Sequence, residues 1–559
     1  MSEKSEIQKL KAEIERLRKE LKKKKKYGLV WEEKPEEVIQ MCKEKLPVVK
    51  EIKNKEIITD RNKPVNLLIE GDNYHALSVL NYTHEKKVDI IYIDPPYNTG
   101  KEKEWKFNDH YVDKEDAYRH SKWLSFMVKR MKLAKNLLKD TGVIFISIDD
   151  NEMAQLKLLM DCPDLFGEKN FVAKLVWRKK YGGGKGARFF VDLHEYVLCY
   201  AKNIDNLNKF TIHRSEKKKQ IFKLTDKYVN KRGRYYIRPL KSGLAYRKNL
   251  IYSIKCPDGS EVKTQWICSR KTFEKLLGED RIVFKKLRSG NYNVYKKFYE
   301  WDFRGRVLPE SILYDLAYNQ NGKEEIKSIF NVQEGREVPF ENAKPTKLIQ
   351  FLISVVPNNK NAIILDFMAG SGTTGHAVLV LNKEDGGNRQ FIMCTNNENN
   401  ICTDVCYPRT KKVIEGYSDL RGRKIEGLSG SLKYFKTDFV DAEPTDKNKI
   451  KLTQQATEML CIKEGTFEPV PTYAEALAGR LDQKFKIFKN NNHYTGIIFD
   501  QLAIPEFKKV IKDIKGKFSV YVFSLSDETF DEEFSDVKQK IKLSPIPEAI
   551  LRVYRRIFK

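Results

Sequence analysis

Apolar residues in the first third of the chain come in short runs that are separated by helical patterns. The runs at residues 66–69, 88–93 and 142–148 are too short for helices and predict buried strands. Between the strands, apolar residues recur at helical spacing over residues 76–80 and 116–139. Strands that alternate with helices in this way predict an α/β fold with a mostly parallel, doubly wound sheet.

The alternation of strands and helices is interrupted once and then returns. Residues 205–320 carry short β-like runs and turns, with a hairpin signal at residues 253–262. The α/β pattern resumes at residues 362–366. The predicted domains are an N-terminal helix over residues 1–30, an α/β domain in two parts over residues 31–204 and 331–440, an insertion over residues 205–330, and a small C-terminal α/β domain over residues 441–559.

The N-terminal residues have the spacing of a coiled-coil seam. Ile7, Leu10, Ile14, Leu17 and Leu21 are separated alternately by three and four residues. A helix with a seam this short is only marginally stable in isolation. It predicts a helix that either pairs with a second copy, giving a homodimer, or packs on the body of the protein.

Composition favours a polyanionic partner. The 559 residues carry a formal net charge of +27 and a pI of about 9.4, which fits a protein that binds nucleic acid. Nine cysteines do not form a disulfide scaffold in a chain of this length, and the closest pair, Cys402 and Cys406, has no second pair to complete a zinc site. No metal is expected. The lack of an apolar N-terminal segment or a bilayer-length apolar span predicts a soluble, cytoplasmic protein without membrane contact.

One predicted strand ends in an acid, a rigid turn and an aromatic ring. The run at residues 88–93 stops at Asp94, and Pro95, Pro96 and Tyr97 follow. Ligands bind at the carboxyl ends of strands in open α/β sheets. Asp94 offers a hydrogen-bond acceptor and Tyr97 a ring face, a set that suits a flat ring carrying an amino group. A purely structural loop is the alternative for this motif taken alone.

A second ligand-type turn follows the strand at residues 362–366. Residues 370–375 fit the pattern G-x-G-x-x-G, and a helix, another strand and the polar residues Asn396, Asn397 and Glu398 come after them. Glycines let a ligand approach the backbone, and an acid after the second strand can accept hydrogen bonds from a ribose. A dinucleotide is a rival ligand for this turn. No G-x-x-x-x-G-K-[ST] loop is present, which argues against an ATPase.

Two stretches combine basic residues with glycines or aromatics. Residues 177–190 predict either a loop that contacts phosphates or an ordinary surface hairpin, and the insertion predicts either a nucleic-acid reader or a basic decorative subdomain. The candidate DNA-binding residues are Arg178, Lys179, Lys180, Lys185, Arg188, Arg234 and Arg238.

The two ligand-type turns together resemble the amino-group DNA methyltransferases that use S-adenosyl-L-methionine. Their order, with Asp94-Pro95-Pro96-Tyr97 first, a basic insertion next and the glycine turn last, is similar to the circularly permuted β class of that family. Residues 341–349 resemble the Lys-Pro-x-x-Leu-Ile segment of this class, and the whole layout resembles the modification subunits of type III restriction-modification systems. The resemblance implies a Rossmann-like methyltransferase domain with a target-recognition insertion.

The resemblance also implies roles for individual residues. Asp94 and the carbonyl oxygen of Pro95 would accept hydrogen bonds from the amino group, Pro96 would complete the motif, and Tyr97 would stack on a base flipped out of double-stranded DNA. The implied cofactor-binding residues are Asp72, Asn73, Lys344, Pro345, Asp366, Phe367, Ala369, Gly370, Ser371, Gly372, Thr373 and Glu398. Asn396 and Asn397 lie as near to the strand end as Glu398, so the residue that holds the ribose stays open.

The implied reaction is methylation of the N6 amino group of adenine. An aspartate rather than a serine at position 94 resembles the adenine enzymes, and the absence of a Pro-Cys dipeptide excludes methylation of a cytosine ring carbon. Methylation of the cytosine N4 amino group or of RNA is the enzymatic alternative, and a non-catalytic specificity subunit is the other. Because the chain has no ATPase loop, DNA cleavage would need a separate helicase–nuclease subunit. The expected location is the cytoplasm of a prokaryote, in association with the nucleoid.

Overall fold

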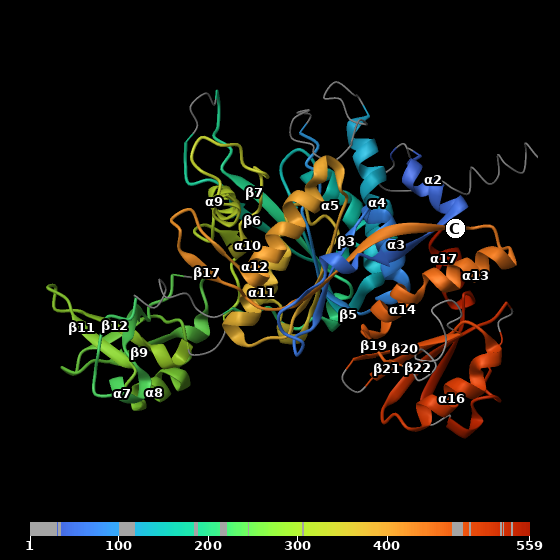
Figure 1. Ribbon diagram of the computed structural model, residues 1–559. Coiled ribbons are helices and arrows are strands. Elements are labelled where there is room, and N and C mark those ends of the chain that lie inside the picture. Colours follow the sequence, from blue (N-terminus) through green and yellow to red (C-terminus); the bar gives the residue numbers. More distant parts are fainter. Residues whose placement is uncertain are drawn as a thin grey trace, which may run out of the picture. The chain divides into compact units, whose positions relative to one another are not determined.

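The structure is a computed structural model of the chain in two compact units (Figure 1). It describes residues 31, 35–99, 118–183, 188–212, 221–243, 245–303, 307–471, 484–490, 493–525, 528, 530–537 and 540–558. The first unit comprises Met1–Asn208 and Ser311–Lys559, and the second comprises Lys209–Glu310. The helix predicted over residues 1–30 lies outside the described residues.

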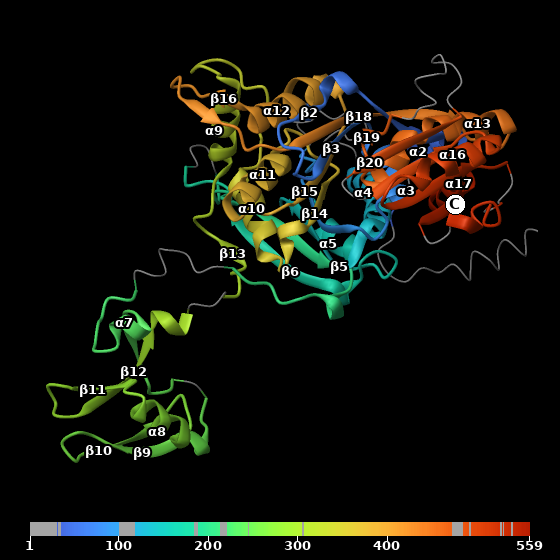
Figure 2. The same cartoon turned by 60° about the horizontal axis from the view of Figure 1, so that its bottom comes forward.

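The first unit is built around one large sheet (Figures 1 and 2). Its strands are β1 Lys45–Glu51, β2 Ile57–Ile58, β3 Val65–Glu70, β4 Val88–Ile93, β5 Leu138–Ile148, β6 Phe171–Arg178, β7 His194–Ala201, β13 Ile312–Leu313, β14 Ile363–Asp366, β15 Gln390–Thr395 and β18 Ser431–Asp441. In the part of the chain that the structure describes, these eleven strands run in the order β1-β18-β3-β15-β14-β4-β5-β7-β6-β13, with β2 paired to β18.

The centre of the sheet is parallel and contains a switch in direction. Strands β18, β3, β15, β14, β4 and β5 are parallel, and β7 is antiparallel to its neighbours β5 and β6. The chain leaves β14 toward β15 and leaves β4 toward β5, on the opposite side. The predicted mostly parallel α/β fold is confirmed. Such a switch point opens a crevice at the carboxyl ends of its two strands.

Helices cover both faces of this sheet. In β4, Ile91 and Ile93 pack in the same core as the helices of one face, and Ile90 and Tyr92 are buried on the other face. A strand buried on both faces reads as a continuous apolar run, which explains the sequence pattern. One face carries α3 (Asn73–Thr83), α4 (Arg119–Leu137) and α5 (Met153–Asp161), and the other carries α10 (Thr346–Val355), α11 (Thr373–Asp385) and α12 (Tyr407–Glu415).

The predicted insertion is longer than the unit that the structure separates. Residues 311–330 belong to the first unit, because β13 pairs with β6 and helix α9 (Asn319–Phe330) packs against α12. The boundary predicted at residue 330 is therefore corrected to about residue 310. Two short strands, β16 (Gly416–Ser418) and β17 (Lys424–Glu426), form a hairpin after α12.

The C-terminal part has its own sheet but shares the core of the first unit. Its strands, in the order β19-β20-β21-β22-β23, are Glu468–Pro469, Phe485–Asn490, His493–Ile498, Lys517–Phe523 and Ile541–Ile546. Its helices are α13 (Asp446–Gln455), α14 (Thr457–Glu464), α16 (Ile504–Lys512) and α17 (Glu548–Ile557). Helices α14 and α17 pack on α3, and Lys87 Nζ donates to the carbonyl oxygen of Lys463 at 2.8 Å. The piece predicted as separate is thus joined to the body by a common core.

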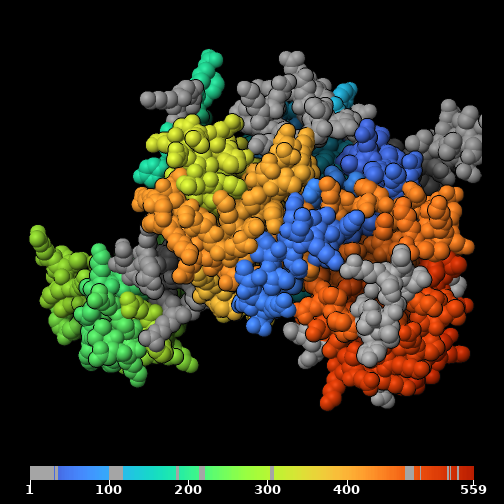
Figure 3. All heavy atoms as spheres, in the orientation of Figure 1, coloured from blue at the N-terminus to red at the C-terminus, as the bar shows by residue number. Residues whose placement is uncertain are grey.

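Segments that are far apart in the chain also meet in the large sheet. Strand β1, which follows helix α2 (Glu37–Glu44), is antiparallel to β18, and β18 continues parallel to β3. In the space-filling view, blue N-terminal residues accordingly border orange residues from the later part of the chain (Figure 3). No helix among the described residues is both long and apolar enough to cross a bilayer.

The second unit is a small β-rich body. Its elements are α7 (Val229–Arg232), β8 (Tyr235–Pro239), β9 (Ile251–Lys255), β10 (Glu261–Gln265), α8 (Arg270–Gly278), β11 (Ile282–Lys286) and β12 (Tyr292–Tyr299). Strands β9 and β10 form the hairpin predicted from the sequence, and β11, β12 and β8 form a second sheet. Trp266 and Phe273 lie in its hydrophobic core.

Candidate active site at the carboxyl ends of strands β4 and β14

The motif Asp94-Pro95-Pro96-Tyr97 lies at the switch point of the sheet. It follows directly after β4, whose neighbour β14 leads into the glycine turn. The turn is fixed from α4, because Trp123 Nε1 donates to the carbonyl oxygen of Pro96 at 2.7 Å. Two motifs that are far apart in the chain are therefore brought to one edge of the sheet.

The carboxylate of Asp94 accepts three hydrogen bonds. Lys344 Nζ donates to both oxygens of Asp94 at 2.9 Å, and the Tyr97 hydroxyl donates to Oδ1 at 2.8 Å. Burial raises the pKa of Asp94, and Lys344 offsets part of that effect. Burial lowers the pKa of Lys344, but Asp94 and the nearby carboxylate of Glu195 outweigh burial, so its pKa lies above the usual value and its ammonium is charged.

A second carboxylate stands beside Asp94. Glu195, at the start of β7, is 6% exposed. Its Oε2 lies 3.5 Å from Lys344 Nζ and accepts a hydrogen bond from the Tyr97 hydroxyl at 3.2 Å. Burial raises the pKa of Tyr97, and both carboxylates raise it further, so this hydroxyl stays a donor. The sequence patterns did not single out Glu195, because a lone acid in a strand carries no motif.

Two lysines take positions other than those suggested by the sequence. The sequence placed Lys344 among the cofactor-binding residues, but its ammonium donates to Asp94. Lys179, placed there among the DNA-binding residues, is 7% exposed and pairs with Asp192 at 2.7 Å and with Glu195 at 3.6 Å. A buried, ion-paired lysine is not on the surface of the basic loop, so the expectation that Lys179 contacts phosphates is corrected.

The segment that carries Lys344 is held by α9. Pro345 is the N-cap residue of α10, and Glu325 of α9 accepts hydrogen bonds from the backbone N–H of Thr346 at 3.2 and 3.3 Å. A Cβ added to Gly322 of α9 would lie 2.0 Å from the carbonyl oxygen of Ala343. Gly322 is therefore a position of close backbone approach that sets the place of Lys344.

Gly322→Ala is expected to destabilise the protein. Alanine favours a helix interior over glycine by about 1 kcal/mol, but the added methyl group meets backbone that no rotamer change can move, and we expect a net loss of about 1–3 kcal/mol. Thermal unfolding measures the effect. Gly278→Ala is the matched control, because a Cβ on this residue of α8 meets open space. A Gly322→Ala protein as stable as the Gly278→Ala protein would contradict the expectation.

The glycine turn after β14 has the backbone shape that its sequence predicts. Gly370 and Gly372 have φ values of 49° and 79°, and a Cβ on Gly372 would lie 3.1 Å from Cys406 Sγ. Asp366 accepts hydrogen bonds from the backbone N–H of Met368 and from the Thr374 hydroxyl. Burial raises the pKa of Asp366 to about 7. Phe367 and Ala369 are buried beside this acid, and the N–H of Ala369 is bonded to β15.

A buried arginine that the sequence patterns did not single out holds the glycine turn. Arg409 of α12 is fully buried, and its Nη1 donates to the hydroxyls of Thr373 at 2.7 Å and Ser371 at 3.1 Å. Its Nη2 lies 3.3 Å from Glu325 Oε2 and 3.3 Å from the Thr346 hydroxyl. One guanidinium thus links the glycine turn to the segment that carries Lys344.

The third strand end, after β3, is organised by another buried arginine. Asp72 is the N-cap residue of α3 and accepts a hydrogen bond from the N–H of Tyr74 at 2.7 Å. Arg130 of α4 donates to Asn73 Oδ1 at 2.5 Å, and its Nη2 lies 3.8 Å from Asp72 Oδ2. Asp72 is 30% exposed, so its carboxylate is held after β3 and is still open to solvent.

The residues after β15 differ in what their side chains already bind. Asn397 Oδ1 accepts hydrogen bonds from the N–H and hydroxyl of Thr403. Asn396 Nδ2 donates to Glu398 Oε2 at 3.5 Å, and within the described residues the buried Asn396 Oδ1 has no hydrogen-bond partner. Of the three residues that the sequence left open, Asn396 has the acceptor that lacks a partner.

The candidate DNA-binding residues lie in different settings. Arg178 is half-buried and donates to the carbonyl oxygen of Lys180, whereas Lys180 and Arg188 are exposed. Arg234 and Arg238 are exposed on the second unit, and Arg238 lies 5.4 Å from the centre of the Tyr236 ring. Lys185 lies outside the described residues.

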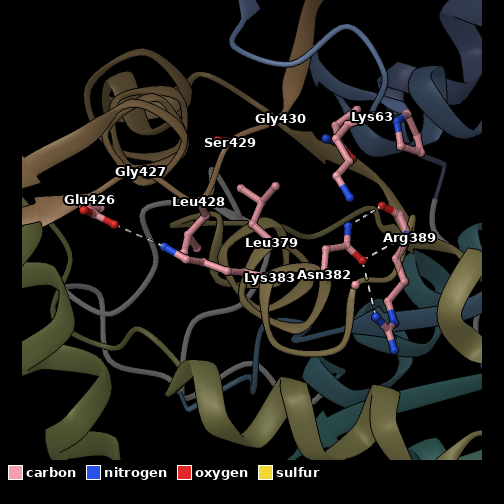
Figure 4. A pocket seen from close by; sticks show the side chains of 13 residues that line it. Lys63, Leu379, Asn382, Lys383, Arg389, Glu426, Gly427, Leu428, Ser429 and Gly430 are labelled. Carbon is pink, nitrogen blue, oxygen red and sulfur yellow. Dashed lines mark hydrogen bonds and ion pairs between the residues drawn. The ribbon is translucent and has the colours of Figure 1, made fainter.

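A further hollow lies away from this site. A cavity of about 470 Å³ opens at the other end of the sheet, where β3 and β15 begin. Its polar lining is largely paired: Lys383 lies 4.0 Å from Glu426, and Arg389 Nη1 donates to Asn382 Oδ1 at 3.3 Å (Figure 4). Lys63 Nζ donates to Asn388 Oδ1 at 3.2 Å. Across the described residues, no cluster of three His, Cys, Asp or Glu side chains could hold a metal ion. The carboxyl ends of the adjacent strands β4 and β14, where the two motifs meet, are the candidate active site.

Comparison with known proteins gives matches across this region. A family model described as DNA methylase matches residues 88–405, more than half of the chain. The chain is 35% identical over 376 residues to the StyLTI Mod subunit, a type III restriction-modification enzyme subunit from Salmonella typhimurium, covering 62% of this chain and 55% of that protein. It is 31% identical over 387 residues to the type II methyltransferase M.KpnI from Klebsiella pneumoniae, covering 64% of this chain and 89% of that protein. The chain thus spans about half the length of the StyLTI relative.

Among solved structures, the crystal structure of the M1.HpyAVI–SAM complex is similar. It is 16% identical in sequence, with a TM-score of 0.27, and the match covers 62% of this chain and 97% of that one.

Proposed function

Because the chain belongs to the DNA methylase family, we propose that it transfers a methyl group from S-adenosyl-L-methionine to the N6 amino group of adenine in double-stranded DNA. The observation that carries the proposal is the meeting of Asp94-Pro95-Pro96-Tyr97 and the glycine turn at the carboxyl ends of the adjacent strands β4 and β14. One turn would present the amino group and the other the methyl donor.

The residues after β4 suit an amino group that must become a nucleophile. The lone pair of the adenine amino nitrogen is conjugated into the ring. Hydrogen bonds from its two N–H groups to the Asp94 carboxylate and the Pro95 carbonyl oxygen favour tetrahedral geometry. They strengthen as positive charge grows on nitrogen, and so stabilise the transition state preferentially. Tyr97 would hold the base by stacking after it is flipped out of the duplex.

The residues around the glycine turn suit S-adenosyl-L-methionine, which supplies a methyl group on a sulfonium. Gly370 and Gly372 keep the backbone clear of side chains, and the buried side chains of Phe367 and Ala369 make the surroundings of the turn apolar. The unpartnered Asn396 Oδ1 can accept a hydrogen bond from a ribose hydroxyl, and Glu398 lies beside it. Asp72, which is held by Arg130, can accept a hydrogen bond from the amino group of the cofactor's adenine ring. Ser371 and Thr373 already bind Arg409, so they shape the turn in this proposal.

The remaining parts suit a modification subunit of the type III kind. The similarity to the StyLTI Mod subunit and the net charge of +27 support DNA as the substrate, with the second unit as the target-recognition domain. Arg178, Lys180, Arg188, Arg234 and Arg238 are the proposed phosphate and base contacts. A homodimer formed through the N-terminal seam and a separate restriction subunit that cleaves DNA complete this proposal.

The test is to identify the methylated base. The full chain is incubated with tritiated S-adenosyl-L-methionine and a long, unmethylated double-stranded DNA of mixed sequence, and the DNA is digested to nucleosides. We expect N6-methyladenine as the labelled product, and sequencing that detects modified bases would then give the recognition site. Label in N4-methylcytosine alone, or methylation of RNA but not of DNA, would overturn the assignment.

A further inference from the structure

In the free protein, Lys344 occupies the places that a target base needs. Its ammonium donates to both oxygens of Asp94 and lies 4.8 Å from the centre of the Tyr97 ring. An adenine that binds Asp94 through its amino group and stacks on Tyr97 requires the same carboxylate and the same ring. The positive charge of Lys344, held beside Asp94, would also oppose the positive charge that develops on the amino nitrogen. Lys344 therefore has to give up its bonds to Asp94 before methyl transfer.

The structure supplies a nearby acceptor for both donors of Asp94. Glu195 Oε2 lies 3.5 Å from Lys344 Nζ and 3.2 Å from the Tyr97 hydroxyl, the same two groups that donate to Asp94. A small shift of each donor replaces one carboxylate by the other, so neither is left buried without a partner.

We propose that Glu195 is a positioning residue that receives the Lys344 ammonium and the Tyr97 hydroxyl when the target amino group binds to Asp94. This role rests on the proposed amino-group methylation and assigns Glu195 a function in it. Glu195 keeps Lys344 neutralised, so that the full charge of Asp94 faces the reacting nitrogen. In this role Glu195 touches neither base nor cofactor.

The charges around the two carboxylates are consistent with the exchange. The titratable groups that act on Asp94 and Glu195 from the surrounding elements are Lys344 before α10, Tyr97 in the turn, Tyr92 of β4, Asp366 of β14, Asp149 after β5 and Lys179 directly after β6. Lys179 pairs with Asp192 and with Oε1 of Glu195. Oε2 of Glu195 is therefore left for the exchange. The Glu195 charge raises the pKa of Asp94, in addition to the larger effect of burial.

The experiment compares Glu195→Gln with the double variant Glu195→Gln/Lys344→Met. Single-turnover methyl transfer to the mixed-sequence DNA is measured against pH, with cofactor affinity measured separately. We expect Glu195→Gln to lower the rate about tenfold to a hundredfold, since Lys344 then stays on Asp94, and to leave cofactor affinity unchanged. Removing the Glu195 charge lowers the pKa of Asp94, so the acidic limb of the rate profile should move to lower pH.

The double variant separates this role from a structural one. It removes both charges, and we expect it to be faster than Glu195→Gln alone, whereas two structural lesions would slow the enzyme further. A Glu195→Gln enzyme as fast as an active wild type, or a double variant slower than Glu195→Gln, would overturn the role of Glu195. A wild type that methylates no adenine would overturn the proposed function and this role with it.

Discussion

Asp94→Ala is expected to lower the rate of methyl transfer at least about a thousandfold, while cofactor affinity stays within a few-fold of the wild type. The variant removes the carboxylate that would balance the positive charge developing on the amino nitrogen. The glycine turn keeps its own hydrogen bonds to Arg409 and Asp366. Lys344 keeps Glu195 at 3.5 Å as a counter-ion, so the variant is expected to fold. Single-turnover transfer of tritium to DNA and calorimetric titration of the cofactor measure the two effects.

The matched control for Asp94→Ala is Asp150→Ala. Asp150 follows the neighbouring strand β5, is exposed, and accepts a hydrogen bond from the Tyr196 hydroxyl at 3.0 Å. We expect its removal to leave methyl transfer near the wild-type rate, because this carboxylate is not part of the Asp94, Lys344 and Glu195 cluster. Asp94→Ala enzyme with more than about a tenth of the wild-type rate would show that Asp94 does not carry the chemistry.

The two turns of the site could be predicted because each is local. Asp94 follows an apolar run and precedes two prolines, and Gly370 to Gly375 follow another run, so a few neighbouring residues define each turn. The contact between Asp94 and Lys344 joins residues 250 positions apart. No local pattern encodes such a pair, and the same holds for Glu195 and Arg409, which enter the site from β7 and α12.

Helix α9 shows where the sequence pattern placed a domain boundary wrongly. The predicted insertion ran to residue 330 and so included this helix. In the structure Gly322 lies inside α9, where the backbone at Ala343 leaves no room for a side chain. Lys179 is a similar case, since a run of basic residues cannot show that one of them is buried against Asp192 and Glu195.

Arg409→Met is expected to cost up to about 3 kcal/mol of stability, because it removes the fully buried partner of an ion pair whose other member, Glu325, is 25% exposed. Glu325 would lose the guanidinium at 3.3 Å, and the hydroxyls of Ser371 and Thr373 would lose a donor. The thermal midpoint should fall by several degrees and cofactor affinity should weaken, since the glycine turn loses its link to α9 and α10. The stability of Arg409→Lys should lie between that of the wild type and that of Arg409→Met. An ammonium cannot reach both Glu325 and the hydroxyls of the glycine turn, as the guanidinium does. Lys411→Met, on the exposed side of the same helix, is the matched control.

The pH dependence of the Arg409→Met defect tests its cause. Burial raises the pKa of Glu325, and Arg409 holds back part of that rise. Without Arg409 the folded-state pKa of Glu325 lies higher still, while its unfolded-state pKa is unchanged. A carboxyl group with a raised folded-state pKa costs stability as pH rises above its unfolded-state pKa, so the gap between variant and wild type should be wider at about pH 8 than at about pH 5. A gap that stays constant or narrows with rising pH would mean that Arg409 acts through packing and not through the charge of Glu325.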